Sequence, residues 1–364
     1  MLMRFVGTAH RPSARRLARA LLAGLLLGAA TPSSAQAPPA LPPVSVGAGV
    51  QASFVHTSPD GAASTDTDTF PLNSVRLYVS GSAANKVKYM FNTEYDGNNH
   101  VNVLDAAAQF EMSPKVNIWV GRMLPPSDRA NLYGPYYSNE WAVFTDGLQD
   151  GYPFVSAGRD NGVLYWGQFD KVKLSGGVFD GPSATGRTTV ISAGRVQVDF
   201  WDPEGGYYLN GTYYGAKNLL AVGIAGQAQG SDGSAWNADF LLEKKVAGGG
   251  AFTIESQYNK YSKLGGYNSR YAESDGAYGL ASFLFPPAMG MTGKFQIMGK
   301  YAKANFTQGL TRLDRDYTQK TTELNVNYLI KDFNARVMFF FKDTRFDAVQ
   351  QNNKQVGVGI QLQI

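Results

Sequence analysis

Apolar and polar residues alternate along the chain in segments of about ten residues. The clearest segment is 355–364 (QVGVGIQLQI), where every second position is apolar: Val356, Val358, Ile360, Leu362 and Ile364. The positions between them hold glutamine and glycine. Because successive side chains of a β-strand point to opposite sides, this period predicts a strand with one apolar and one polar face.

Similar alternation recurs in sixteen segments, each near the length that a tilted strand needs to cross a bilayer. The predicted strands are residues 44–56, 72–82, 86–96, 101–112, 115–123, 158–169, 171–180, 190–201, 219–229, 235–245, 251–261, 276–285, 293–303, 318–330, 333–346 and 353–364. An even number of such strands is typical of bacterial outer-membrane barrels.

The links between these strands alternate in length. Half of them are mostly tight turns, such as 83–85 and 113–114, and the others include the long links 57–71, 124–157, 262–275 and 304–317. Short turns at one end and long loops at the other are the asymmetry expected of such a barrel. The link 202–218 is the exception, because it is long but lies at the short-turn end.

A secreted β-sandwich or adhesin is the alternative fold, since its strands alternate in the same way. Aromatic residues near the predicted strand ends favour the barrel, because amphipathic rings sit well at lipid headgroups. These residues are Tyr89, Tyr95, Trp119, Tyr165, Trp166, Trp201, Trp236, Tyr258, Tyr261, Tyr301 and Tyr328. A closed barrel also leaves no unpaired strand edge in lipid.

The first 35 residues have the features of an export signal. Four arginines between Arg11 and Arg19 precede the apolar run 20–30, and small residues follow at 33–37. The apolar run is too short to span a bilayer as a helix. We therefore predict a cleaved signal at 1–35, a Pro-rich lead at 36–43 and a transmembrane barrel at 44–364.

Removal of the signal changes the charge of the chain. The whole chain has a net charge of +4, but five of its 33 basic residues and none of its 29 acidic residues fall within 1–35. The processed chain therefore keeps 28 basic residues and has a net charge of −1. Nucleic-acid binding has no support from this balance. The absence of cysteine excludes disulfide and thiolate–metal frameworks.

Several stretches resemble the phosphate-selective porin O and P family. They are 75–81 (VRLYVSG), 120–126 (VGRMLPP), 138–141 (SNEW), 159–163 (RDNGV) and 215–223 (GAKNLLAVG). The resemblance covers most of the chain after the signal. It implies a trimeric, sixteen-stranded outer-membrane porin whose third loop folds into the lumen. The nearly neutral charge departs from that family's selective members, so phosphate selectivity does not follow.

The long link 124–157 is the candidate constriction of the pore, because a loop of this length in a compact barrel is more often functional than idle. We predict that Arg122 and Arg129 face permeating anions across the constriction, with Asp128 and Glu140 opposing them. The alternative is an outer loop held by surface ion pairs.

The strand phases also predict which charges line the lumen. The basic candidates are Arg76, Lys88, Lys115, Lys171, Lys173, Arg195, Lys294, Lys300, Arg336 and Lys342. The acidic candidates are Glu94, Asp105, Glu111, Asp199, Asp239, Glu243, Glu255 and Glu323. Singly, each is best interpreted as a solvated lumen residue; as a group, the basic set favours a modest anion preference.

These patterns predict a porin of the bacterial outer membrane, in contact with its lipid, that lets small hydrophilic solutes or anions diffuse passively. The alternative is a non-conducting barrel or secreted β-protein acting as an adhesin or scaffold. We expect no enzyme activity, cofactor or metal site. A hydrolase built on His100, near Asp96 and Asp105, is the third hypothesis, and no nucleophile motif accompanies it.

Overall fold

The computed structural model describes residues 43–61, 64–95, 100–141, 145–148, 158–181, 190–230, 233–264, 270–287, 290, 292–348 and 350–364. The predicted export signal, residues 36–42 of the predicted lead, and residues 142–144 and 149–157 of the predicted constriction loop lie outside this part of the chain.

The described residues form one antiparallel sheet of sixteen long strands and one short strand. The long strands are β1 (Val44–Pro59), β3 (Leu72–Ala84), β4 (Val87–Tyr95), β5 (Val101–Ser113), β6 (Val116–Met123), β7 (Asp160–Phe169), β8 (Val172–Phe179), β9 (Ile191–Asp199), β10 (Leu219–Gln229), β11 (Gly233–Val246), β12 (Gly250–Ser262), β13 (Tyr271–Leu284), β14 (Lys294–Gly309), β15 (Tyr317–Lys331), β16 (Ala335–Phe346) and β17 (Asn353–Gln363). The short strand β2 (Thr67–Thr69) pairs with β1.

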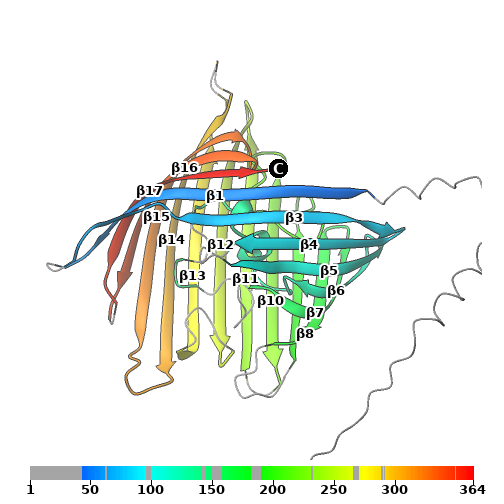
Figure 1. Ribbon diagram of the computed structural model, residues 1–364, viewed down its shortest axis with the longest axis horizontal. Helices are drawn as coiled ribbons and strands as arrows, with labels where there is room; N and C mark the ends of the chain where they lie inside the picture. The colour runs from blue at the N-terminus through cyan, green and yellow to red at the C-terminus, as the bar shows by residue number, and fades with distance from the viewer. Residues whose placement is uncertain are drawn as a thin grey trace, which may run out of the picture. The chain divides into compact units, whose positions relative to one another are not determined.

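The sheet closes on itself through β1. Each long strand pairs with its neighbours along the chain, and β1 pairs with β3 on one side and with β17 on the other, from Gly49↔Gln363 to Pro59↔Asn353. Figure 1 shows β1 and β3 crossing the direction of β11 and β12, as expected for tilted strands on opposite walls of a barrel. The predicted sixteen-stranded antiparallel barrel is confirmed.

All sixteen predicted spans coincide with a strand, and the differences lie at the boundaries. β13 begins five residues before its prediction, at Tyr271, and β14 extends to Gly309. The sequence gives no signal for β2, because its three residues (TDT) are polar and its register depends on β1 alone. Within the described residues, no helix is long and apolar enough to cross a membrane.

The two faces of the sheet follow the predicted alternation. In β17 the side chains of Gln361 and Gln363 point inward and are buried, whereas those of Val356, Ile360 and Leu362 point outward and are at least half exposed. Exposed aliphatic side chains in this pattern would be costly in water and are typical of a surface that faces lipid.

The predicted aromatic belts hold only in part, because three of their members face the lumen. Trp119, Trp166 and Tyr261 are buried on the inner side of β6, β7 and β12. They belong to an apolar cluster that includes Leu164, Phe179 and Ile191. A lumen that held only water would leave these apolar side chains exposed to it. We therefore expect a further segment inside the barrel that covers the cluster.

Candidate functional site in the lumen

Two segments contact the lumen-facing side of the barrel wall, and they come from opposite ends of the barrel. The first inward segment (residues 124–141 and 145–148) follows β6, at the end with the long loops. The second inward segment (residues 203–214) joins β9 to β10, at the end with the tight turns. Backbone hydrogen bonds join the two: Leu209 N donates to Leu132 O at 3.3 Å, and Gly211 N donates to Tyr137 O at 2.8 Å.

The first inward segment contains a short helix, α1 (Arg129–Tyr133), followed by the 3-10 turn η1 (Pro135–Tyr137). Asp128 caps α1, because its side chain accepts a hydrogen bond from Asn131 N. The apolar side of this region packs on the lumenal cluster: Leu124, Leu132, Tyr207 and Leu209 all contact it. The covering segment that the cluster requires is therefore built from both inward segments.

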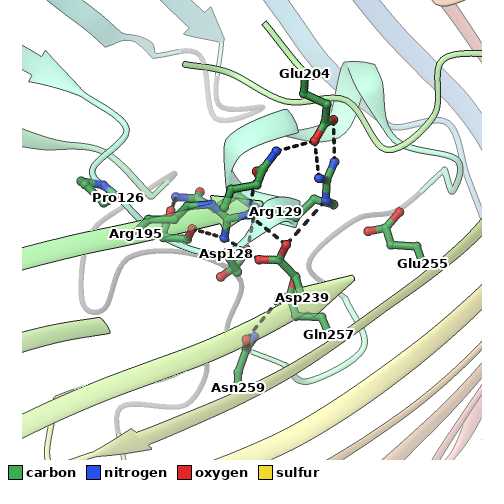
Figure 2. A network of polar contacts seen from close by, with 12 residues as sticks. Pro126, Asp128, Arg129, Arg195, Glu204, Asp239, Glu255, Gln257 and Asn259 are labelled. Carbon is green, nitrogen blue, oxygen red and sulfur yellow. Dashed lines mark hydrogen bonds and ion pairs between the residues drawn. The ribbon is translucent and has the colours of Figure 1, made fainter. Parts of the chain in front are cut away.

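Arg129 ties the two inward segments together. Its guanidinium donates to Glu204 Oε1 at 2.9 Å and Oε2 at 2.5 Å, and to Asn210 O at 3.0 Å (Figure 2). Its Nε lies 3.6 Å from Asp239 Oδ1, and Asp239 in turn accepts two hydrogen bonds from Arg195. We call Arg129, Arg195, Glu204 and Asp239 the Arg129 network. It is buried and holds two positive and two negative charges.

A second group of charges holds the far end of the first inward segment. Lys300 Nζ lies 2.7 Å from Glu140 Oε2 and 2.7 Å from Asp146 Oδ2, and Lys342 donates to Thr145. Glu323 stands directly opposite both lysines on β15. We call Lys300, Lys342, Glu140, Asp146 and Glu323 the Lys300 cluster. It is buried and holds two basic and three acidic residues.

The two groups shift the pKa of Glu140 and that of Glu204 in opposite directions. Burial raises the pKa of Glu140 to about 8, since the attraction of Lys300 is offset by Glu323 and Asp146. Burial acts on Glu204 in the same sense, but the charge and hydrogen bonds of Arg129 outweigh it and hold the pKa of Glu204 at about 2.

Further hydrogen bonds complete the attachment between these two groups. Arg336 donates to Ser138 O at 2.6 Å, and Asn327 donates to Asn139 O at 3.1 Å. Tyr133 donates to Glu255 at 2.9 Å. Side chains of β12, β15 and β16 thus bind the backbone and the helix of the first inward segment.

The structure brings three of the four predicted constriction residues into the lumen. Arg129, Asp128 and Glu140 are buried there, but each has a partner other than the one predicted: Glu204, the α1 backbone and Lys300. Arg122 departs from the prediction. It stands opposite Ala106 on the outward face of β6, and its Nε donates to Val103 O. A residue one position from the lumen phase points to the other side of the sheet.

Eight of the ten basic lumen candidates lie on inward strand positions: Arg76, Lys88, Lys173, Arg195, Lys294, Lys300, Arg336 and Lys342. Lys115 and Lys171 lie in turns outside the strands instead. β6 and β8 begin one residue later than predicted, at Val116 and Val172, because the turns β5–β6 and β7–β8 take up these lysines. The candidates on inward strand positions are therefore eight basic and eight acidic residues.

Sequence reasoning missed the second inward segment and with it Glu204. Its sequence (PEGGYYLNGTYY) contains four tyrosines, and its length is unusual for the short-turn end. That combination is the signal that could have placed it inside the barrel, because tyrosine covers apolar surface and still donates a hydrogen bond. Tyr207 does both: its ring packs 5.2 Å from that of Trp119, and its hydroxyl donates to Leu124 O.

Two cavities lie beside the inward segments. One, of about 380 Å³, lies between β3, β4, β5 and both inward segments, and its charged lining residues are Arg76, Asp105 and Arg159. The other, of about 350 Å³, lies against β15, β16 and β17, and its charged lining residue is Lys342. The inward segments therefore narrow the lumen and leave spaces lined by polar groups on two sides.

The hypothesis of a hydrolase site at His100 gains no support from the described residues. Asp105 faces the lumen, where it accepts a hydrogen bond from Arg159, and Asp96 lies outside the described residues. Another histidine, His56, lies between a carboxylate and a hydroxyl on the outward face of β1. His56 Nδ1 lies 2.8 Å from Asp68 Oδ1, and its Nε2 lies 3.3 Å from Ser58 Oγ.

No protein-family model and no curated protein sequence matches the chain. Solved structures do. OprB of Pseudomonas putida is similar with a TM-score of 0.61 and 10% identity, over 88% of this chain and 94% of that one. An anion-selective porin from Comamonas acidovorans is similar with a TM-score of 0.55 and 14% identity, over 88% and 99%. A loop-deletion mutant of OmpT, an outer membrane protein of Vibrio cholerae, is similar with a TM-score of 0.53 and 12% identity, over 88% of this chain and 99% of that one.

These likenesses show that the chain has the fold of outer-membrane porins. At such low identity they show the fold alone. Membership of the phosphate-selective porin O and P family stays a prediction.

Proposed function

We propose that this protein is a passive diffusion channel of the outer membrane for small hydrophilic solutes. The observation that carries this proposal is the partly filled lumen: the barrel is closed, its inner face is charged, and two inward segments narrow it without removing the cavities at their sides. Such a constriction selects solutes by diameter and by the charges that line it.

A modest anion preference is part of the proposal. The strands contribute balanced charges, but the charged residues that line the two cavities are three basic and one acidic: Arg76, Arg159, Lys342 and Asp105. Local charge of one sign in a narrow channel concentrates the opposite ion. The similar porin from Comamonas acidovorans, which is described as anion-selective, agrees with this expectation.

The location and the assembly of the protein are further parts of the proposal. The outward apolar face needs lipid, and a cleaved signal at 1–35 would export the chain to the outer membrane. We also propose a homotrimer, the assembly that the resemblance to the phosphate-selective porin O and P family implies.

Recording from planar lipid bilayers tests this function. We expect stepwise, ohmic current increases from the purified protein, and in a salt gradient a reversal potential on the anion-selective side. Insertion without current would favour the adhesin or scaffold alternative. A protein that is soluble without detergent would contradict the membrane location.

Ester hydrolysis is a second candidate function. One observation favours it, the contacts among Ser58, His56 and Asp68. Their contacts have the order of an acyl-transfer triad, with the acid on Nδ1 and the hydroxyl on Nε2. His56 and Asp68 are solvent-exposed, and Asp66 also approaches Nε2 at 3.7 Å. Hydrolysis of a nitrophenyl ester that is lost in Ser58→Ala would support this function, and equal rates in both proteins would exclude it.

A further inference from the structure

Three basic residues stand side by side on the outward face of the barrel, at the end with the long loops. Lys303 of β14 lies directly opposite Lys320 of β15, and Lys320 lies directly opposite Arg345 of β16. All three side chains are exposed, and the residue before each of them is buried on the inner face. We call Lys303, Lys320 and Arg345 the outer basic row. Because like charges directly opposite each other destabilise a sheet, the row needs negative charge from its surroundings.

The acidic residues beside the outer basic row do not balance it. Asp343 accepts a hydrogen bond from Arg345 at 2.9 Å, but it also lies directly opposite a fourth base, Lys354 of β17. Asp347, after the end of β16, attracts Lys320 and accepts a hydrogen bond from a backbone N–H of β15. Two acids thus serve four bases. Neither lysine of the row forms an ion pair with any residue that the structure describes.

The acids of β13 are no better placed to balance the row. Asp275 lies directly opposite another lysine, Lys260 of β12, and its carboxylate accepts a hydrogen bond from Asn305 at 3.1 Å. Glu273 stands opposite Thr307, four residues and thus about 13 Å further toward the loop than the level of the row. The excess of positive charge therefore stays on β14 to β17.

The rest of the outward face at this end is nearly uncharged. Apart from Arg122, the described outward residues at the loop ends of β3 to β10 carry no charge. They include Val75, Tyr95, Val101, Val103, Asn161, Val163, Ser192 and Ala228. The outer basic row is therefore a local feature of one sector of the barrel rather than a general property of its rim.

An exposed apolar surface begins next to the row, toward the middle of the strands. Tyr301 is the next outward residue to Lys303 on β14, and Leu324 lies four residues, about 13 Å, from Lys320 along β15. Leu324 and Phe339 are each more than half exposed. Such side chains meet acyl chains in a bilayer, and the long loops of these barrels face the outside of the cell. The row therefore stands at the level of the lipid headgroups of the outer leaflet.

We propose that the outer basic row binds the phosphate groups of an anionic lipid in the outer leaflet, whose acyl chains lie against Leu324 and Phe339. Ammonium and guanidinium groups donate charge-assisted hydrogen bonds to phosphate oxygens. Neighbouring strands lie about 4.8 Å apart, so the row spans about 10 Å and can serve more than one phosphate of the same headgroup. This surface lies outside the lumen and goes beyond the proposed channel function.

Other occupants fit the row less well. A free phosphate ion supplies the charge but leaves the apolar surface beside the row without a partner. A second copy of this chain offers another outer basic row or the nearly uncharged outward ends of β3 to β10, and neither supplies negative charge. A lipid with a phosphorylated headgroup satisfies both parts of the surface at once.

Native mass spectrometry of the full-length protein, released from detergent micelles that contain a probe lipid, counts the bound lipids and measures their affinity. The probes are lipid A with two phosphate groups, its form with one phosphate group, and phosphatidylcholine, which has no net charge. We expect saturable binding of the first, at least about fivefold weaker binding of the second, and no saturable binding of phosphatidylcholine. Excess inorganic phosphate should not displace the bound lipid.

A double variant locates the site. Lys303→Gln with Lys320→Gln removes two exposed charges that repel each other, so the barrel should fold normally. The affinity for the lipid with two phosphate groups should fall about twentyfold, or about fivefold for each lysine. Lys260→Gln is the matched control, because Lys260 is an outward lysine at the same end with Asp275 directly opposite. It should change the affinity by less than about twofold.

Four outcomes contradict the proposal. They are the absence of saturable binding, equal affinities for the two forms of lipid A, displacement of the lipid by inorganic phosphate, and equal losses in the double variant and in Lys260→Gln. A double variant that binds the lipid as the parent protein does but changes its oligomeric state in detergent also refutes it, and assigns the row to a contact between copies of the chain.

Discussion

The Arg129 network and the Lys300 cluster hold the same inward segment, but they differ in charge balance. The network contains two positive and two negative groups, and each carboxylate accepts two hydrogen bonds from an arginine. The cluster contains three carboxyls around two lysines. A balanced buried group keeps its charges at any ordinary pH, whereas an excess of acid favours retention of a proton.

The first inward segment is therefore held at one end by charges that persist over the ordinary pH range, and at the other end by charges that change with pH. The network also joins the two inward segments, so its loss affects the whole filling of the lumen. The cluster attaches only the far end of the first inward segment to β14 and β16. The predictions below separate these two roles.

The largest effect is expected for Arg129→Met. Removal of the guanidinium leaves Glu204 and Asp239 buried with one arginine between them, and breaking such a pair from one side costs roughly 3–5 kcal/mol. Urea unfolding in lipid vesicles, followed by tryptophan fluorescence, measures this loss. The double variant Arg129→Met with Glu204→Gln should lose less, because it removes the orphaned charge. A loss below about 1 kcal/mol in the single variant would show that water reaches the network.

A pH titration of the unfolding free energy comes second. The pKa of Glu204 falls from 4.5 to about 2 on folding, so its contribution is complete above about 4.5 and is lost as pH falls toward 2. The pKa of Glu140 rises from 4.5 to about 8, so the folded state binds the extra proton, and stability falls as pH rises from about 4.5 to 8.

Glu140→Gln is the control for this titration. It should remove the decline toward pH 8 and leave the decline at acid pH. If the unfolding free energy of the variant and that of the parent protein change equally with pH between 5 and 8, Glu140 is ionised in the folded state. The charge of the Lys300 cluster then does not change in this range.

Lys300→Gln should have a smaller effect on stability and a clear one on current. It leaves Glu140, Asp146 and Glu323 with Lys342 alone, so we expect a shift of the reversal potential toward cations and a larger single-channel conductance. Lys294→Gln, on the same face of β14, is the matched control, because Lys294 lies at the turn end and donates to Gly249 O. Equal shifts in both variants would assign the effect to net charge rather than to the cluster.

The barrel could be predicted from the sequence because its signal is repeated sixteen times and each error is local. Val356, Ile360 and Leu362 need only a period of two to be placed outside, and the structure agrees. The lumen depends on contacts between residues far apart, such as Arg129 and Glu204, 75 positions apart, and no local pattern encodes such a pairing. Trp119 shows a different limit: it fits a lipid belt by composition, but it shares its face of β6 with Asn117, opposite Ile118 and Val120, and it packs on Tyr207 inside the barrel.

The smallest effect is expected for Arg122→Gln, the predicted constriction residue that the structure places outside. Its guanidinium contacts the backbone of β5 through one hydrogen bond, to Val103 O at 3.1 Å, and its strand neighbours Ala106 and Asn161 share the outward face. The bilayer and the wall of the barrel then separate it from the permeating ions. The reversal potential should match that of the parent protein, and the unfolding free energy should change by less than about 0.5 kcal/mol, as for exposed positions in general. A shift comparable to that of Lys300→Gln would mean that β6 turns at Gly121 and returns Arg122 to the lumen, and the constriction would then have to be assigned again from that residue.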